Sequence, residues 1–100
     1  MTLFPYTTLF DLLNHADKLL YYEKIIRSKA YYRSRACSEL MHVATEDDAA
    51  MKLLVTLLND SNQELRKAVA RACKLFNFND QKRYKNIHLL LREIEHLPEC

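Results

Sequence analysis

The chain contains no glycine, and its two prolines, Pro5 and Pro98, lie close to its two ends. Glycine supplies positive φ angles and close backbone approach to ligands. Its absence excludes phosphate-binding loops, dinucleotide fingerprints, nucleophile elbows and EF-hand loops. Hairpin turns of the Asn-Gly and Asp-Gly type are excluded for the same reason. Because neither strong helix breaker occurs between residues 6 and 97, we predict an all-α protein.

The length of 100 residues is enough for one hydrophobic core. We expect residues 1–100 to form a single helical domain that needs no cofactor, structural metal or disulfide. The N-terminus lacks a basic segment followed by an apolar run, so no secretory signal is expected, and no apolar run is long enough for membrane insertion. The cysteines, Cys37, Cys73 and Cys100, are odd in number and widely spaced, which favours reduced thiols and a cytoplasmic location.

Polar capping residues predict three helix starts in the second half of the chain. Thr45 precedes three acidic residues, and Ser61 with Glu64 forms an S-x-x-E capping box. Asn79 or Asp80 precedes the last apolar stripe. The helices predicted from these starts cover about residues 46–58, 62–76 and 81–97.

The predicted helix over residues 46–58 is apolar around most of its circumference, so we expect it in the middle of the molecule. Only residues 59–61 separate it from the next helix. Such a short turn requires two nearly antiparallel helices.

The first half of the chain allows two interpretations. An apolar stripe continues in helical phase over residues 12–44. Arg33 falls inside this stripe, where an unpaired charge would be costly. We favour a break within residues 27–34, near Ser28 or Ser34, which gives two helices here and four to five in all. One long bent helix is the alternative.

Residues 54–76 combine an apolar helix, an aspartate at the turn, a capped second helix with an arginine, and then alanines at helical spacing. This pattern resembles a HEAT/armadillo-like α-helical repeat, over about residues 46–78. Asp60 and Arg66 match the family's turn aspartate and second-helix arginine. The resemblance implies a structural polar contact between these two side chains and stacking on neighbouring repeats.

A second copy of the repeat is faint. Arg-Ala-Cys occurs at residues 35–37 and 71–73, an offset of 36, whereas Leu-Leu-Asn occurs at residues 12–14 and 57–59, an offset of 45. The two offsets disagree. A short HEAT-like α-solenoid and an irregular helical bundle therefore both remain open.

The net charge of +2 conceals alternating blocks, because residues 21–35 carry +4 and residues 36–60 carry −4. Such blocks are typical of solvated helix faces. Within the basic block, tyrosines accompany the cations, and on a continuous helix several of them lie opposite the apolar stripe. Tyrosine and arginine often anchor protein interfaces, although tyrosines that pack on a neighbouring helix give the same pattern. The predicted partner-binding residues are Tyr21, Lys24, Arg27, Tyr31 and Arg35.

Catalytic and metal-binding patterns are not found in the sequence. The histidines are scattered without zinc-enzyme spacing, and Cys37 with His42 is not a site without further partners. We therefore expect a non-catalytic adaptor or chaperone-like module that binds a protein partner through a helical surface. An incompletely capped short repeat can also form a homodimer. The alternative is a nucleic-acid-binding regulator whose phosphate contacts are Lys24, Arg27, Lys29, Arg33 and Arg35.

Overall fold

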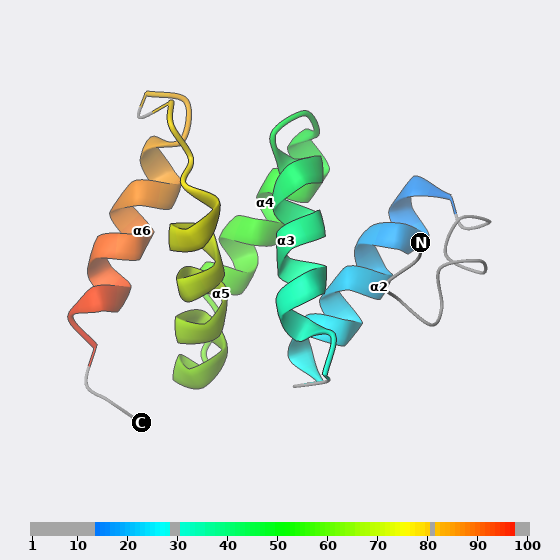
Figure 1. Cartoon of the computed structure of the whole chain (residues 1–100), viewed down its shortest axis with the longest axis horizontal. Coiled ribbons are helices and arrows are strands. Elements are labelled where there is room, and N and C mark those ends of the chain that lie inside the picture. The colour runs from blue at the N-terminus through cyan, green and yellow to red at the C-terminus, as the bar shows by residue number, and fades with distance from the viewer. Residues whose placement is uncertain (1–13, 29–30, 81, 98–100) are drawn as a thin grey trace.

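The computed structural model describes residues 14–28, 31–80 and 82–97 (Figure 1). Within these ranges the chain forms five α-helices and no strand, so the prediction of an all-α fold is confirmed. None of the described helices has the length and apolar character needed to cross a membrane. The helices are α2 (His15–Arg27), α3 (Arg33–Ala44), α4 (Asp48–Leu58), α5 (Gln63–Phe76) and α6 (Lys85–Glu95).

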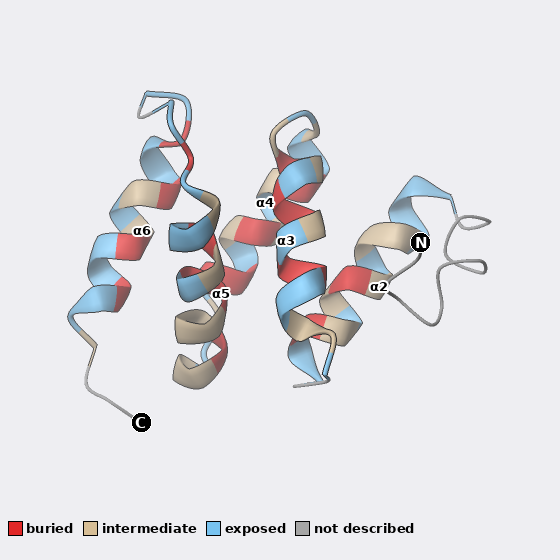
Figure 2. Cartoon of the chain, viewed as in Figure 1, coloured by how far each residue is buried: buried red, intermediate tan, exposed pale blue. Residues whose placement is uncertain are grey.

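Helix α4 lies at the centre of the fold and contacts each of the other four helices. Its mostly apolar circumference explains this position, because a polar face would be buried wherever α4 met a neighbour. All five helices contribute to one continuous buried cluster, and Figure 2 shows the buried residues on the sides where helices face one another. Representative members, one from each helix in chain order, are Ile26, Leu40, Leu54, Val69 and Ile87.

Helices α3 and α5 lie side by side and run in the same direction (Figure 1). At their N-terminal ends, Arg33 Nη1 of α3 lies 2.8 Å from Glu64 Oε1 of α5. At their C-terminal ends, the rings of His42 and Phe76 meet edge to face with centroids 4.9 Å apart. Two contacts at opposite ends fix a parallel alignment.

Helices α2 and α4 are aligned in the same way. His15 Nε2 lies 3.0 Å from Asp47 Oδ2 at the start of both helices. At the other end, Nη1 of Arg27, the last residue of α2, lies 2.8 Å from Oδ1 of Asp60, two residues after α4. Successive helices therefore alternate in direction, and each helix lies parallel to the next but one.

The first half of the chain forms two helices, as the favoured interpretation predicts. Helix α2 ends at Arg27, and the Ser28 hydroxyl donates to the Ile25 carbonyl. Helix α3 begins at Arg33, whose side chain is only 14% exposed and donates from Nε to the Ile26 carbonyl at 2.6 Å. The single long helix is therefore excluded.

The predicted cap at Thr45 is wrong. Asp47 caps α4, because its carboxylate accepts from the Ala50 amide at 2.8 Å. The Thr45 hydroxyl instead donates to the His42 carbonyl at the end of α3. Thr45 therefore ends one helix and does not begin the next.

The predicted capping box at Ser61 and Glu64 is also wrong. Asn62, one residue later, caps α5 by accepting from the Leu65 amide at 3.1 Å. Glu64 forms an ion pair with Arg33 of the neighbouring helix α3. The predicted helix itself, over residues 62–76, agrees closely with α5.

The last helix begins later than the prediction of residue 81. Asp80 accepts from the Arg83 amide at 3.0 Å and so caps a short turn before α6. The helix then runs from Lys85 to Glu95. Residue 81 lies outside the described residues.

Neither repeat offset in the sequence corresponds to equivalent helix positions. Asn14 caps the start of α2, whereas Asn59 follows the end of α4, so the Leu-Leu-Asn match joins unlike sites. The starts of α2 and α4 are 33 residues apart and their ends are 31 apart. The Arg-Ala-Cys match likewise joins unlike positions, because residues 35–37 are the third to fifth of α3 and residues 71–73 are the ninth to eleventh of α5.

One residue performs the task that glycine often performs at the end of a helix. Asn77 follows α5 with φ 58° and ψ 74°, in the left-handed region, and its amide donates to the Cys73 carbonyl. Asparagine tolerates this conformation better than most residues. The chain thus makes a left-handed helix end without glycine.

Candidate functional site

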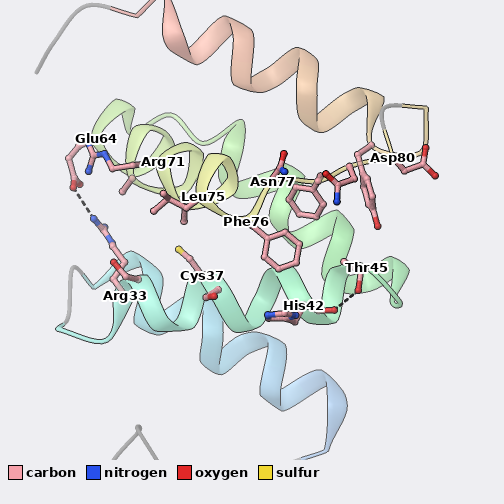
Figure 3. Close-up of a pocket in the computed structure, with 17 residues that line it drawn as sticks. Arg33, Cys37, His42, Thr45, Glu64, Arg71, Leu75, Phe76, Asn77 and Asp80 are labelled. Carbon is pink, nitrogen blue, oxygen red and sulfur yellow. Dashed lines mark hydrogen bonds and ion pairs between the residues drawn. The ribbon is translucent and has the colours of Figure 1, made fainter.

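A groove of about 910 Å³ runs between α3 and α5 and borders the connection to α6. Small side chains line much of the facing surfaces, Ser34 and Ser38 on α3 and Ala68 and Ala72 on α5. Because these side chains are short, the two parallel helices pack at their buried edges and leave the outer side open. Figure 3 shows the groove with side chains from both helices directed into it.

The groove contains a large apolar side chain that the fold does not cover. Leu75 of α5 is 84% exposed although it lies beside the core residue Cys73 and the half-buried Phe76. In Figure 3, Leu75 and Cys37 point towards each other across the space between α5 and α3. An exposed leucine is ordinary on its own, but one inside a groove adds to a concave apolar surface.

Charged groups stand at the N-terminal end of the groove. Arg33 and Glu64 form the ion pair that joins the two helices and neutralise each other there. Arg71, which also lines the groove, is exposed and has no hydrogen-bond or ion-pair partner in the described part of the chain. Its guanidinium is therefore available to a carboxylate from outside.

Aromatic rings border the opposite end. Arg83 donates to the Thr45 carbonyl and so ties the connection before α6 to the end of α3. Four aromatic rings contact one another in series at this end of the groove, and their successive centroids are 4.9, 4.7 and 4.7 Å apart. The series is His42, Phe76, Phe78 and Tyr84.

The cysteines near the groove lack the properties of a nucleophile. Burial raises the pKa of the Cys37 thiol to about 11 and that of Cys73 to about 12. A reactive cysteine needs the opposite shift, towards the thiolate. His42 lines the same groove but its ring packs on Phe76. Among the described residues, no group of three potential ligands is placed to hold a metal ion.

The five predicted partner-binding residues do not share one helix face, because the break after α2 separates them. Arg27 is engaged, with its Nε 2.9 Å from Glu23 and its Nη1 2.8 Å from Asp60. Tyr31 is 93% exposed in the connection, where its ring meets Tyr32 edge to face. The others lie on two helices: Tyr21, half-buried, and Lys24, exposed, on α2, and Arg35, exposed, on α3.

The expected contact between Asp60 and Arg66 is replaced by another. Asp60 accepts from the Asn62 amide at 3.0 Å and from Arg27 at 2.8 Å. These two bonds, the amide bond first, hold the pKa of Asp60 below its ordinary value, and Arg66 adds only a weaker charge effect. Arg66 Nε is buried without a hydrogen-bond partner among the described residues. Arg27 reaches Asp60 from α2, a helix that the resemblance does not cover.

Sequence reasoning did not identify Arg71 and Leu75 as surface residues of a groove. A signal was present, because the buried stripe of α5 passes through Leu65, Val69 and Cys73 at four-residue intervals. Leu75 lies two residues after Cys73, about 200° further around the helix, and so off the stripe. A large apolar residue off the buried stripe indicates an uncovered apolar surface.

Comparison with models of protein families, with curated proteins and with solved structures gave no match to this chain. The resemblance to HEAT/armadillo-like repeats therefore stays a prediction.

Proposed function

We propose that this chain is a non-catalytic protein-binding module, an adaptor or chaperone-like domain, that holds a segment of its partner in the groove between α3 and α5. The observation that carries the proposal is Leu75, which is 84% exposed inside a groove of about 910 Å³. Covering a leucine side chain contributes about 1.5–3 kcal/mol. A partner segment that fills the groove gains this energy without any rearrangement of the fold.

The order of the helices supports a scaffold of this kind. Helices α3 and α5 lie side by side and parallel, as the corresponding helices do in stacked helical repeats, which bind their partners along the surface that such rows of helices present. We propose a short HEAT-like repeat on this basis. A cytoplasmic setting is part of the proposal, supported by Cys37 and Cys73, which are free and buried. Cys100 lies outside the described residues.

The nucleic-acid alternative has weaker support. Among its five phosphate-binding cations, Arg27 is paired with Asp60 and Glu23, and Arg33 is paired with Glu64. Ion pairs of this kind reduce the charge available to phosphates. Lys29 lies outside the described residues.

Site-specific photocrosslinking in cells tests the proposal. A photoreactive amino acid is placed at one of three exposed positions: that of Leu75 in the groove, that of Tyr31 in the basic segment, or that of Leu89 on α6 as the control. We expect a discrete adduct from the groove position, removed by protease and resistant to nuclease. The control position should give none.

Two results would contradict the proposal. An adduct from the position of Tyr31 alone would place the binding surface on the basic-aromatic segment, residues 21–35. A nuclease-sensitive adduct would favour the nucleic-acid regulator.

A further inference from the structure

Charge is divided unevenly between the segments of the chain. The segments that surround the groove, residues 31–45 and 61–84, carry eight lysines and arginines against three acidic residues. The other described segments, residues 14–28, 46–60 and 85–97, carry six against eight. Part of this excess lies away from the groove, because Lys74 pairs with Glu95 of α6, and the groove lining itself holds two arginines and two carboxylates. Arg33 is neutralised by Glu64, so Arg71 is the arginine of the lining that has no partner in the described part of the chain and can pair with a carboxylate from outside.

The groove presents a cation and an apolar group at a defined spacing. Arg71 and Leu75 are four residues apart on α5, so their side chains lie on the same face, about 6 Å apart along the axis. Both line the groove. A matching ligand carries a carboxylate about one helical turn away from a large apolar side chain.

The walls of the groove favour a helical ligand. They are formed by two helices, whose main-chain groups are bonded internally, and the described residues contain no strand edge to which an extended peptide could add. A bound helix satisfies its own main-chain hydrogen bonds and needs only side-chain contacts. The 12 residues of α3 give a wall about 18 Å long, enough for about three turns of a ligand helix.

We propose that the occupant of the groove is an acidic amphipathic helix of a partner protein. A carboxylate of this helix pairs with Arg71, and an apolar side chain one turn away packs on Leu75 and Phe76. The inference rests on the proposed function and adds the chemistry of the partner to it. A nucleic acid fits less well, because Arg33 is already paired with Glu64 and the lining then offers Arg71 as its one unpaired arginine, whereas a phosphate backbone needs a row of cations.

Selection from a displayed random library of peptides of about 16 residues, long enough for four helical turns, tests the chemistry of the occupant. The folded protein is the target, and the Leu75→Ser variant is used to remove peptides that bind elsewhere. We expect the selected peptides to be enriched in an acidic residue three or four positions from a leucine, isoleucine, phenylalanine or methionine.

One selected peptide, synthesised with a fluorescent label, is then titrated with the protein. Leu75→Ser should weaken its binding at least about tenfold, the effect of losing one buried aliphatic side chain. Arg71→Glu should weaken it as well, and exchange of the peptide's acidic residue for arginine should restore binding to that variant. The matched controls are Leu89→Ser and Arg92→Glu on α6, which should leave the affinity unchanged.

The possible results distinguish a failure of the proposed occupant from a failure of the proposed function. Selection of basic or uncharged peptides that still depend on Leu75 would overturn the acidic helix and leave the groove as the binding site. Peptides whose binding ignores both Leu75 and Arg71, or no selected peptides at all, would overturn both. Tighter binding of a labelled single-stranded DNA of about 20 nucleotides, with a steep salt dependence, would indicate that the occupant is a nucleic acid and not a peptide.

Discussion

Arg33 donates a hydrogen bond from Nε to the main-chain carbonyl of Ile26, at 2.6 Å. This carbonyl belongs to the last turn of α2, where no later helical amide can reach it. Nη1 of the same guanidinium lies 2.8 Å from Glu64 Oε1. One side chain at the start of α3 therefore closes the end of α2 and holds the start of α5.

Replacing Arg33 by methionine keeps most of its length and removes both interactions. Because the side chain is only 14% exposed, we expect a loss of about 1–3 kcal/mol in the free energy of unfolding. Urea denaturation followed by circular dichroism measures it. Arg92→Met, on the exposed side of α6, is the matched control and should change stability by less than about 0.5 kcal/mol. Equal midpoints for the two variants would contradict the role of Arg33.

The same residue indicates what the sequence predicts well. A charge inside an apolar stripe predicted a break, and α2 does end at Arg27, because the guanidinium needs the free carbonyl that a helix end provides. The central position of α4 was also predictable, because a helix that is apolar on nearly all sides is stable only where other helices surround it. The partners of Arg33 were not predictable, because they depend on which helices become neighbours.

Cap positions were less predictable for a related reason. Thr45, Ser61 and Asp80 each lie within a few residues of a helix start, but several neighbouring side chains offer an equivalent oxygen. Tertiary contacts decide between them, as when Glu64 faces Arg33 and does not complete a capping box. Helix existence could therefore be predicted from the sequence, but not the exact first residue.

Replacement of Arg66 by methionine and replacement of Arg27 by methionine should have different effects on stability. Arg66 Nε is buried without a hydrogen-bond partner in the described part of the chain, so Arg66→Met should leave stability unchanged or raise it. Arg27→Met should lower stability, because it leaves Asp60 and Glu23 without their guanidinium. Thermal unfolding of both variants in one buffer decides the question. A larger loss for Arg66→Met would instead favour the polar contact that the repeat resemblance implies.

Stability should fall in alkaline solution. Burial raises the pKa of Cys37 to about 11 from an ordinary 9.0, and that of Cys73 to about 12 from 9.0. Burial, followed by the charge of Glu39, raises the pKa of Tyr22 to about 12 from 10.0. Groups with raised folded pKa values contribute fully below their ordinary pKa and lose this contribution as pH rises through the folded pKa. The loss therefore begins near pH 9 and continues to about pH 12.

Urea midpoints at about pH 7 and about pH 10.5 measure this loss. A Cys73→Ala variant removes one of the three groups and should show a smaller difference between the two midpoints, although its midpoint at neutral pH is itself lower because a buried side chain is shortened. A variant with an undiminished pH dependence would indicate that the Cys73 thiol is not shielded from water.

Acidic solution should remove the contribution that Asp47 and Asp60 make to stability. The Ala50 amide and then His15 hold the pKa of Asp47 below its ordinary value, and the Asn62 amide and then Arg27 do so for Asp60. Lowered folded values stabilise the protein above the ordinary pKa of 3.8, and this stability is lost as pH falls through the folded values. Asp60→Asn should therefore lower the thermal midpoint at neutral pH and flatten its decline below pH 3.8. Glu93→Gln, at an exposed position on α6, is the control and should reproduce the full decline.

The groove was predictable only in part, because a sequence defines which residues lie off a buried stripe but not which helix stands beside them. Leu75 lies off the stripe of α5, and only the parallel neighbour α3 turns that position into one wall of a concavity. The shared face predicted for the basic-aromatic segment, residues 21–35, illustrates the complementary case. This face required one helix, and the break after Arg27 divides it.

The same substitution at two leucines separates the core from the groove. Leu54 of α4 is fully buried and Leu75 is 84% exposed. Leu54→Ala should cost about 2–5 kcal/mol through lost transfer energy and the cavity left behind, whereas Leu75→Ala should stay within about 0.5 kcal/mol. Urea denaturation of each variant gives the two values. The wild-type experiment, repeated over a wide range of protein concentration, then tests self-association. If Leu75→Ala proves costly and the wild-type midpoint rises with concentration, a second copy of the chain covers the groove, because only an associating protein gains stability from concentration.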